Sequence, residues 1–340
     1  MLVNIKRKSN GKIQREIAKN IINQRKKVDF MGIYTLTLSA AFDIYCDAPT
    51  LAVGQENIAN IKYRCAGGKG INISRALSEY GIESDAIMLL GEDNAQDFLG
   101  MIYAPYINIR KIGVMGRIRE NFTFRTDCGV ETRISFNSPP VPESTLATLE
   151  CELATLTDGD VLTVTGRVPE GIDVRALVDI LIALRGRGVR LVIDSRSFTL
   201  DDILAIRPFL IKPNEEELSL YLECDVKDMK SVAAAASELS RRGVECVMVT
   251  LGSRGALVAK EGVAYYTPTP SITPVSTVGA GDAAIAGFLV AYTRGEGISD
   301  ALRLAASFGT AACLTRGTDA PTREKIDEIY ATLPQAERVL

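Results

Sequence analysis

A short glycine-containing segment, Gly279-Ala280-Gly281-Asp282, has the residue types to act on an anion. It follows an extended stretch and leads directly into an apolar segment, which predicts a helix over Asp282–Arg294. Glycines let main-chain N–H groups approach a ligand, and a helix start offers unpaired N–H donors and the positive end of its dipole. These features predict an anion site, commonly a phosphate site. Asp282 at its rim could act as a general base toward a hydroxyl, although a glycine turn with Asp282 as the N-cap is the alternative.

A second glycine cluster, Gly67-Gly68-Lys69-Gly70, precedes a predicted helix that ends near Tyr80. Its free N–H groups and the Lys69 ammonium could hold a polar or anionic ligand. Asn72, on the first turn of that helix, could bond sugar hydroxyls. The spacing matches neither a Walker A loop nor G-x-G-x-x-G, and a tight turn into a helix explains the cluster equally well.

The segment Lys212-Pro-Asn-Glu-Glu-Glu217 permits two interpretations. Asn214 and Glu217 have the spacing of a capping box, which would make them purely structural. Alternatively, their oxygens could steer hydrated Mg²⁺, which keeps several of its waters when protein-bound.

A fourth motif, Thr250-Leu-Gly-Ser-Arg-Gly255, follows a predicted strand. Gly252, Ser253 and Gly255 would place N–H groups beside a ligand at the carboxyl edge of a sheet. A plain hairpin turn is the alternative.

Composition narrows the chemistry further. The chain has 340 residues, a formal net charge of −3 and no histidine, so Ser–His and His–metal sites are excluded. The near-neutral charge gives no reason to expect nucleic acid or a membrane as a partner. The seven cysteines include no C-x-x-C pair, which is typical of a reduced, cytoplasmic protein.

Residues 1–30 differ from the rest of the chain because they are strongly basic. They lack the apolar core of a signal peptide, and isoleucines roughly one turn apart permit a short amphipathic helix. We expect an N-terminal extension, either solvated or in contact with an acidic partner.

From Ile33 onward, apolar strands alternate with helical segments, which predicts an α/β domain over residues 31–340 with a mostly parallel, doubly wound sheet covered by helices on both faces. Two polar-alternating intervals, near residues 43–65 and 117–137, interrupt this pattern. Because a half-polar strand suits a sheet with one wet face, we expect these intervals to form a small β-sheet outside the main core. Such a sheet could act as a lid or as a partner surface.

Taken together, the motifs resemble those of the ribokinase-like (PfkB) carbohydrate kinase family. The matching segments are Gly67–Asn72, Ser276–Asp282 and Lys212–Glu217. Ile33–Leu38 followed by Asp43, with Gly70–Arg75, is similar to one branch: 1-phosphofructokinases, tagatose-6-phosphate kinases and the minor 6-phosphofructokinase. The resemblance runs from about Ile33 to the C-terminus and leaves residues 1–30 outside.

The resemblance implies ATP-dependent phosphorylation of a hydroxyl on a sugar phosphate, with Mg²⁺, and a lid that often makes homodimers. Asp282 would be the catalytic base, and the main chain of Gly279, Ala280 and Gly281 would stabilise the transferring phosphoryl group. The remaining implied roles fall into three sets. The metal would be organised, through its water molecules, by Asn214 and Glu217. The residues beside ATP would be Lys212, Asn214, Gly252, Ser253, Gly255, Thr277, Gly279 and Gly281. The sugar phosphate would be held by Asp43, Gly68, Lys69, Asn72, Arg119, Asn121 and Arg167, with Arg119 pairing with its phosphate.

Two departures from the family pattern affect substrate choice. Ser39-Ala-Ala-Phe-Asp43 replaces Asn-Pro-x-x-Asp, and Thr165-Gly-Arg167-Val-Pro169 replaces Ser-Gly-Ser-x-Pro. Arg167 could therefore add a phosphate contact or crowd the pocket. Fructose 1-phosphate is the first candidate substrate, followed by tagatose 6-phosphate and fructose 6-phosphate. A kinase for an unphosphorylated sugar or nucleoside, and a non-catalytic sugar-phosphate sensor, are the alternatives; an oxidoreductase is disfavoured because no dinucleotide fingerprint follows the first strand.

Overall fold

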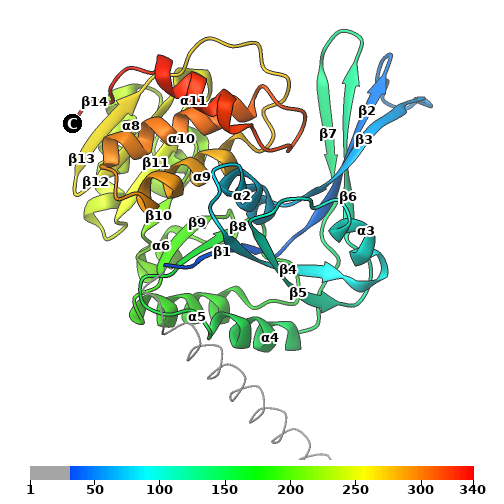
Figure 1. Cartoon of the computed structure of the whole chain (residues 1–340), viewed down its shortest axis with the longest axis horizontal. Helices are drawn as coiled ribbons and strands as arrows, with labels where there is room; N and C mark the ends of the chain where they lie inside the picture. Colours follow the sequence, from blue (N-terminus) through cyan, green and yellow to red (C-terminus); the bar gives the residue numbers. More distant parts are fainter. Residues whose placement is uncertain (1–30) are drawn as a thin grey trace, which may run out of the picture.

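The structure is a computed structural model that describes residues 31–340 (Figure 1). The basic N-terminal extension that we predict over residues 1–30 lies outside the described residues.

A large sheet forms the centre of the molecule (Figure 1). Its strands are β1 (Ile33–Thr37), β4 (Ser84–Gly91), β5 (Ile107–Val114), β8 (Val161–Thr165), β9 (Arg190–Asp194), β10 (Leu210–Ile211), β11 (Cys246–Thr250), β12 (Ala256–Lys260), β13 (Val263–Thr267) and β14 (Glu337–Arg338). They lie in the order β14-β13-β12-β11-β10-β9-β8-β1-β4-β5. Neighbours from β11 to β5 are parallel, and those from β11 to β14 are antiparallel. The predicted mostly parallel sheet is therefore confirmed.

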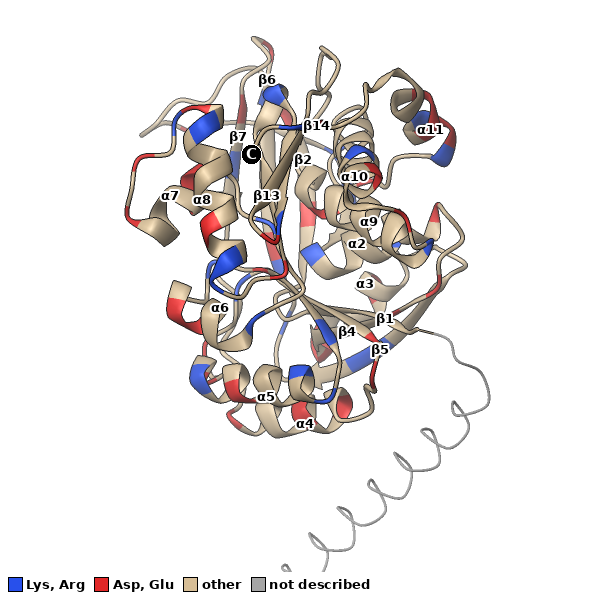
Figure 2. Cartoon of the chain, turned by 90° about the vertical axis from the view of Figure 1, so that its left-hand side faces the viewer, with Lys and Arg blue, Asp and Glu red and all other residues tan. Residues whose placement is uncertain are grey.

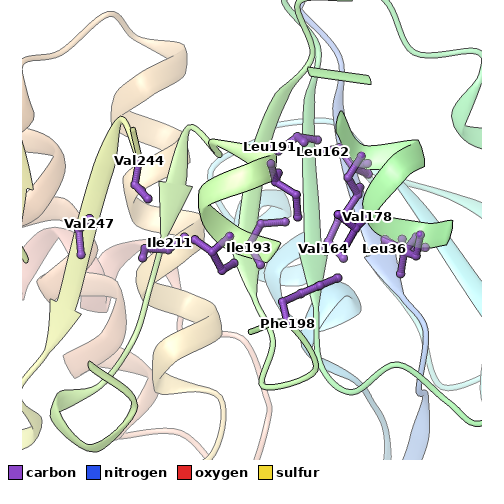
Figure 3. Close-up of a cluster of buried hydrophobic side chains, with 14 of the residues drawn as sticks. Leu36, Leu162, Val164, Val178, Leu191, Ile193, Phe198, Ile211, Val244 and Val247 are labelled. Atoms are coloured by element: carbon purple, nitrogen blue, oxygen red, sulfur yellow. The ribbon is translucent and has the colours of Figure 1, made fainter. Parts of the chain in front are cut away.

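Helices cover both faces of this sheet. One face carries α4 (Ser144–Leu153), α5 (Val174–Gly186), α6 (Leu200–Ile206), α7 (Glu215–Leu222) and α8 (Met229–Arg241). The other carries α2 (Lys69–Ser78), α9 (Ala280–Thr293), α10 (Ile298–Ala312) and α11 (Arg323–Thr332). A separate apolar cluster fills each interface, because strands buried on both faces need apolar side chains on both. Figure 3 shows part of the first cluster, where Val178 of α5 lies over Leu162 and Val164 of β8. Figure 2 shows Lys, Arg, Asp and Glu distributed over the outer helices α4, α5, α6 and α8.

A second, four-stranded sheet extends from the main body (Figure 1). It consists of β3 (Asn60–Gly67), β2 (Ala41–Ala48), β6 (Arg119–Thr126) and β7 (Glu131–Ser135), in that order. β6 and β7 fall within the second polar-alternating interval of the sequence, and β2 and β3 extend two residues beyond the two ends of the first. We call this small sheet the lid sheet.

The two faces of the lid sheet differ in chemistry. Asp43, Asn121 and Arg133 share one face, because Asp43 pairs with Asn121 and Arg133 contacts Asp43 diagonally across the sheet. Ile44 pairs with Phe122, and Phe122 pairs with Ile134, so the opposite face is apolar. The end of this apolar face nearest the main sheet packs against the short helix α3 (Ala95–Leu99), within a third apolar cluster. Alternation of polar and apolar residues along each strand thus produces one polar and one apolar surface.

Five α-helices and β-strands of the described chain were not predicted from the sequence: β5, α3, α4, α6 and β14. β5 is an edge strand with several exposed polar side chains, so its sequence lacks the apolar run of the central strands. The 7-residue helix α6 is too short to show a clear helical period, although Thr199 and Asp202 form a capping box at its start.

Candidate active site

Asp282 is buried at the start of α9. The helix begins after Gly279, whose φ of 85° is a left-handed conformation that favours glycine. The Asp282 side chain is 5% exposed, and its Oδ2 accepts a hydrogen bond from Asn72 Nδ2 over 2.9 Å. Burial raises the pKa of Asp282 to about 6, partly opposed by the nearby Lys69 ammonium. The carboxyl is therefore ionised at neutral pH yet basic enough to take a proton, as a general base requires.

Two lysines contact a second buried carboxylate, Asp194, next to Asp282. Lys69 Nζ lies 2.9 Å from Asp194 Oδ2, and Lys212 Nζ lies 3.6 Å from Asp194 Oδ1. Burial alone would raise the pKa of Asp194, but Lys212 and Lys69 outweigh burial and hold it below its ordinary value. Asp194 thus stays ionised and fixes both ammonium groups beside the start of α9.

Gly281 lies close to the Lys212 ammonium. A Cβ at residue 281 would lie 2.8 Å from Lys212 Nζ. The Lys212 ammonium consequently lies directly against the first turn of α9, where main-chain N–H groups are unpaired. Together they concentrate positive potential at one point, which suits a phosphoryl group that gains charge.

A cavity of about 360 Å³ lies over Asp282 and is roofed by the lid sheet. Asp43 of β2 is buried in its wall, where its Oδ1 accepts from Asn121 Nδ2 at 2.9 Å and from Arg133 Nη2 at 2.7 Å. Its Oδ2 lies against Gly67, where a Cβ would approach within 2.2 Å. Asp43 is thus held rigidly, in position to accept from a hydroxyl in what we call the small cavity.

Three guanidinium groups from separate segments line the same small cavity: Arg119 of β6, Arg133 of β7 and Arg167 of the loop after β8. Arg119 donates to the main-chain oxygens of Phe136 and Ser39. Burial lowers the pKa of Arg119, and the charges of Arg133 and Arg167 lower it further, while Asp43 raises it.

The small cavity carries a positive excess. Five basic side chains line it against three acidic ones: Lys69, Arg119, Arg133, Arg167 and Lys212 against Asp43, Asp194 and Asp282. This net charge of +2 is equal in magnitude and opposite in sign to that of a phosphate monoester dianion.

A larger cavity, of about 920 Å³, adjoins the first. Gly281 lines both cavities, so they meet at the first turn of α9. Predicted nucleotide-site residues in the large cavity are Asn214, Gly252, Ser253, Gly255, Thr277 and Gly281, and Ala280 of the predicted catalytic segment lies there as well. Gly255 cannot be replaced easily, since a Cβ there would lie 2.1 Å from the Thr267 oxygen. The size and the glycine-rich wall suit a nucleotide whose terminal phosphate points at Gly281.

Asn214 and Glu217 form the capping box that the sequence allows. Asn214 Oδ1 accepts from the Glu217 N–H at 2.8 Å, and Glu217 Oε2 accepts from the Asn214 N–H at 3.0 Å. Glu217 lines neither of the two cavities; it faces a third one together with Arg196. In residues 31–340 no group of three or more acidic or cysteine side chains could hold a metal. The two residues fit Mg²⁺ only through its water shell, because their oxygens already accept N–H bonds.

The structure brings most of the predicted residues together. Those in the small cavity are Asp43, Gly68, Lys69, Asn72, Arg119, Asn121, Arg167, Lys212, Gly279, Gly281 and Asp282. Lys212 belongs to this group rather than to the large cavity, where we expected it beside ATP.

Sequence reasoning missed Asp194, Arg133 and Arg196. Asp194 ends strand β9, and a carboxylate at the carboxyl end of a parallel strand is a recognisable signal. Arg133 and Arg196 offer no such signal, because only the strand register and the fold bring them to their partners.

The fold and the paired cavities define a kinase of the ribokinase-like class. The family model described as pfkB family carbohydrate kinase matches residues 39–325. A 1-phosphofructokinase from Escherichia coli (strain K12) is 31% identical over 281 residues, which are 82% of this chain and 90% of that protein. The crystal structure of phosphofructokinase-2 from Escherichia coli in complex with substrates and products has a TM-score of 0.84 at 26% identity, covering 88% of this chain and 99% of that one.

A ribokinase from Thermotoga maritima shares the fold, with a TM-score of 0.72 at 19% identity over 89% of this chain and all of that one. This chain belongs to the pfkB family of carbohydrate kinases. It is accordingly a phosphotransferase that uses an alcohol group as acceptor.

Proposed function

We propose that this protein transfers the terminal phosphoryl group of ATP to a hydroxyl of a sugar phosphate, with fructose 1-phosphate as acceptor and fructose 1,6-bisphosphate as product. The observation that carries this proposal is the small cavity, which has a buried base at one side and three arginines around it. The relative from Escherichia coli named 1-phosphofructokinase supports the choice of acceptor.

Asp282 is the proton acceptor in this proposal. The attacking hydroxyl would donate to Asp282, whose raised pKa of about 6 lets it take the proton as the oxygen attacks phosphorus. Asn72 Nδ2 donates to Asp282 Oδ2 and so orients the carboxyl toward the acceptor.

The start of α9 stabilises the transferring group. The N–H groups of Gly279, Ala280 and Gly281 and the ammonium groups of Lys69 and Lys212 would neutralise charge on the phosphoryl oxygens. Mg²⁺, when bound with the nucleotide, would add positive charge at the phosphates, and the Asn214 and Glu217 side chains would hold its waters.

The charge of the small cavity favours a phosphosugar over a neutral sugar. Arg119 and Arg167 lie where they could pair with a phosphate dianion, and a neutral substrate would leave the cavity's positive excess uncompensated. Arg167 is exposed and its Nη1 donates to Asn137 Oδ1 at 3.1 Å, which supports an added phosphate contact rather than a crowded cavity. Tagatose 6-phosphate and fructose 6-phosphate are the alternative acceptors.

The decisive experiment measures ADP release with Mg-ATP across fructose 1-phosphate, tagatose 6-phosphate, fructose 6-phosphate, fructose and ribose. We expect the highest kcat/KM for fructose 1-phosphate. A preference for fructose or ribose would reject a phosphosugar substrate. ATP binding and thermal stabilisation by a phosphosugar, with no ADP formed from any of the five, would instead indicate a sensor.

We also propose a homodimer formed through the lid sheet. The apolar face of this sheet is only partly covered: Ile61 and Ile134 are exposed, and Phe122 and Phe124 are half-buried. A second copy that lays the same face against it would remove this apolar area from water, as two-fold symmetric interfaces do. Sedimentation velocity of the full chain tests this, because a single monomeric species at micromolar concentration would reject it.

No helix in the described part of the chain combines the length and apolarity needed to cross a bilayer. The cytoplasmic location remains our prediction, to be checked by fractionating cells that produce the protein.

A further inference from the structure

Glu217, the acidic side chain that we propose beside the metal, already has a cationic partner. Arg196 Nε lies 2.7 Å from Glu217 Oε1. Glu217 Oε2 accepts from the Asn214 N–H, so both oxygens of the carboxylate are engaged by N–H donors of the chain. The Glu217 side chain is 17% exposed, which leaves a narrow approach for any additional partner.

Arg196 reaches Glu217 from the loop after β9. It follows Asp194 by two residues, and its side chain is 69% exposed. A second carboxylate, Glu216, lies 3.9 Å away from Arg196 Nη2. The guanidinium therefore stands over the acidic first turn of α7 and lines the third cavity together with Glu217.

An arginine at this place competes with a divalent cation. Removing one positive charge several ångströms from a doubly charged ion in a solvated site strengthens its binding about three- to fivefold. The ion pair and the Asn214 N–H together hold the Glu217 carboxylate at the third cavity, and Glu217 does not line the large cavity that would receive the nucleotide.

We propose that Arg196 lowers the affinity of this site for divalent cations, by neutralising Glu217 and engaging its Oε1 atom. Arg196 acts as a positioning residue for Glu217. The inference rests on the proposed function only in assigning Glu217 to the metal. As a consequence, the unchanged protein should bind divalent cations weakly in the absence of nucleotide.

The test is a titration of the full-length protein with Mn²⁺ alone, in which electron paramagnetic resonance measures the free ion. We expect Arg196→Gln to bind Mn²⁺ about three- to fivefold more tightly than the unchanged protein. Because Arg196 is exposed, we expect Arg196→Gln to fold normally, and circular dichroism of each variant checks this.

Two further variants make the result specific. Arg242→Gln removes the same charge from the same third cavity and should leave Mn²⁺ binding unchanged. Adding Glu217→Gln to Arg196→Gln should abolish the gain in Mn²⁺ affinity. Equal affinity of Arg196→Gln and the unchanged protein, an equal gain in Arg242→Gln, or a gain that survives Glu217→Gln would each overturn the proposal. Because no sugar is present in the titration, its result stands apart from the outcome of the acceptor panel.

Discussion

Asp282→Asn tests the active-site assignment through activity and stability at once. The change removes the proposed base while keeping the shape of the side chain and an oxygen that can accept from Asn72 Nδ2. We expect kcat to fall by about a hundred- to ten-thousand-fold, the usual contribution of a general base. ATP binding should be preserved, since Asp282 lines the small cavity and not the large one.

The effect of the same change on stability follows from the raised pKa. The pKa rises from 3.8 to about 6 on folding. The folded carboxyl holds its proton more tightly than the unfolded one, so this contribution to stability is complete below pH 3.8 and is lost as pH rises through about 6. At about 1.4 kcal/mol per pKa unit, ionised Asp282 costs the folded state up to about 3 kcal/mol at pH 8. Asp282→Asn should therefore raise the free energy of unfolding by about 1–3 kcal/mol at pH 8.

Asp194→Asn provides the matched control. Asp194 is equally buried but pairs with Lys69 and Lys212, which hold its pKa low. Its loss leaves two ammonium groups without their partner and should destabilise the fold by about 3 kcal/mol.

The assays are coupled ADP release, calorimetric ATP titration, and thermal unfolding at pH 8 of both variants. Near-normal turnover in Asp282→Asn would remove Asp282 from the role of base. A lower melting temperature in Asp282→Asn, or a higher one in Asp194→Asn, would refute our account of the two buried charges.

Three further predictions concern the same site and the lid. The value of kcat/KM should fall about tenfold per pH unit below pH 6, as Asp282 becomes protonated. A kcat/KM independent of pH between 4.5 and 7.5 would contradict the role of Asp282 as general base. Arg133→Gln should raise KM for the phosphosugar about tenfold and leave that for fructose within about twofold, because it removes one of the positive charges that line the small cavity while a glutamine amide can still donate to Asp43; equal losses for both sugars would indicate a purely structural role. Ile134→Asp should convert the proposed dimer into monomers in sedimentation velocity, because Ile134 is 49% exposed on the apolar lid face, whereas Leu220→Asp on α7 should have no such effect.

Much of the local architecture around the site could be predicted from the sequence. Gly279 and Gly281 mark a helix start that could accept an anion, and the φ of 85° at Gly279 is one that favours glycine. Asn214 and Glu217 have the spacing of a capping box, and the box is present. Such features depend on neighbours within a few residues, so they can be inferred from short motifs. The alternation of strands and helices likewise follows from local apolar periodicity.

The long-range partners were decided by the tertiary structure. Arg133 reaches Asp43 across 90 residues because β2 and β7 both pair with β6 in one register, and a shift of one residue would turn its side chain to the apolar face. Asp194 meets Lys69 across 125 residues because β9 and α2 approach the same edge of the parallel sheet. The sequence by itself determined where an anion could bind and which side chain could take a proton. The charges that tune this chemistry come from distant segments, and only the packing of the sheet and its lid brings them together.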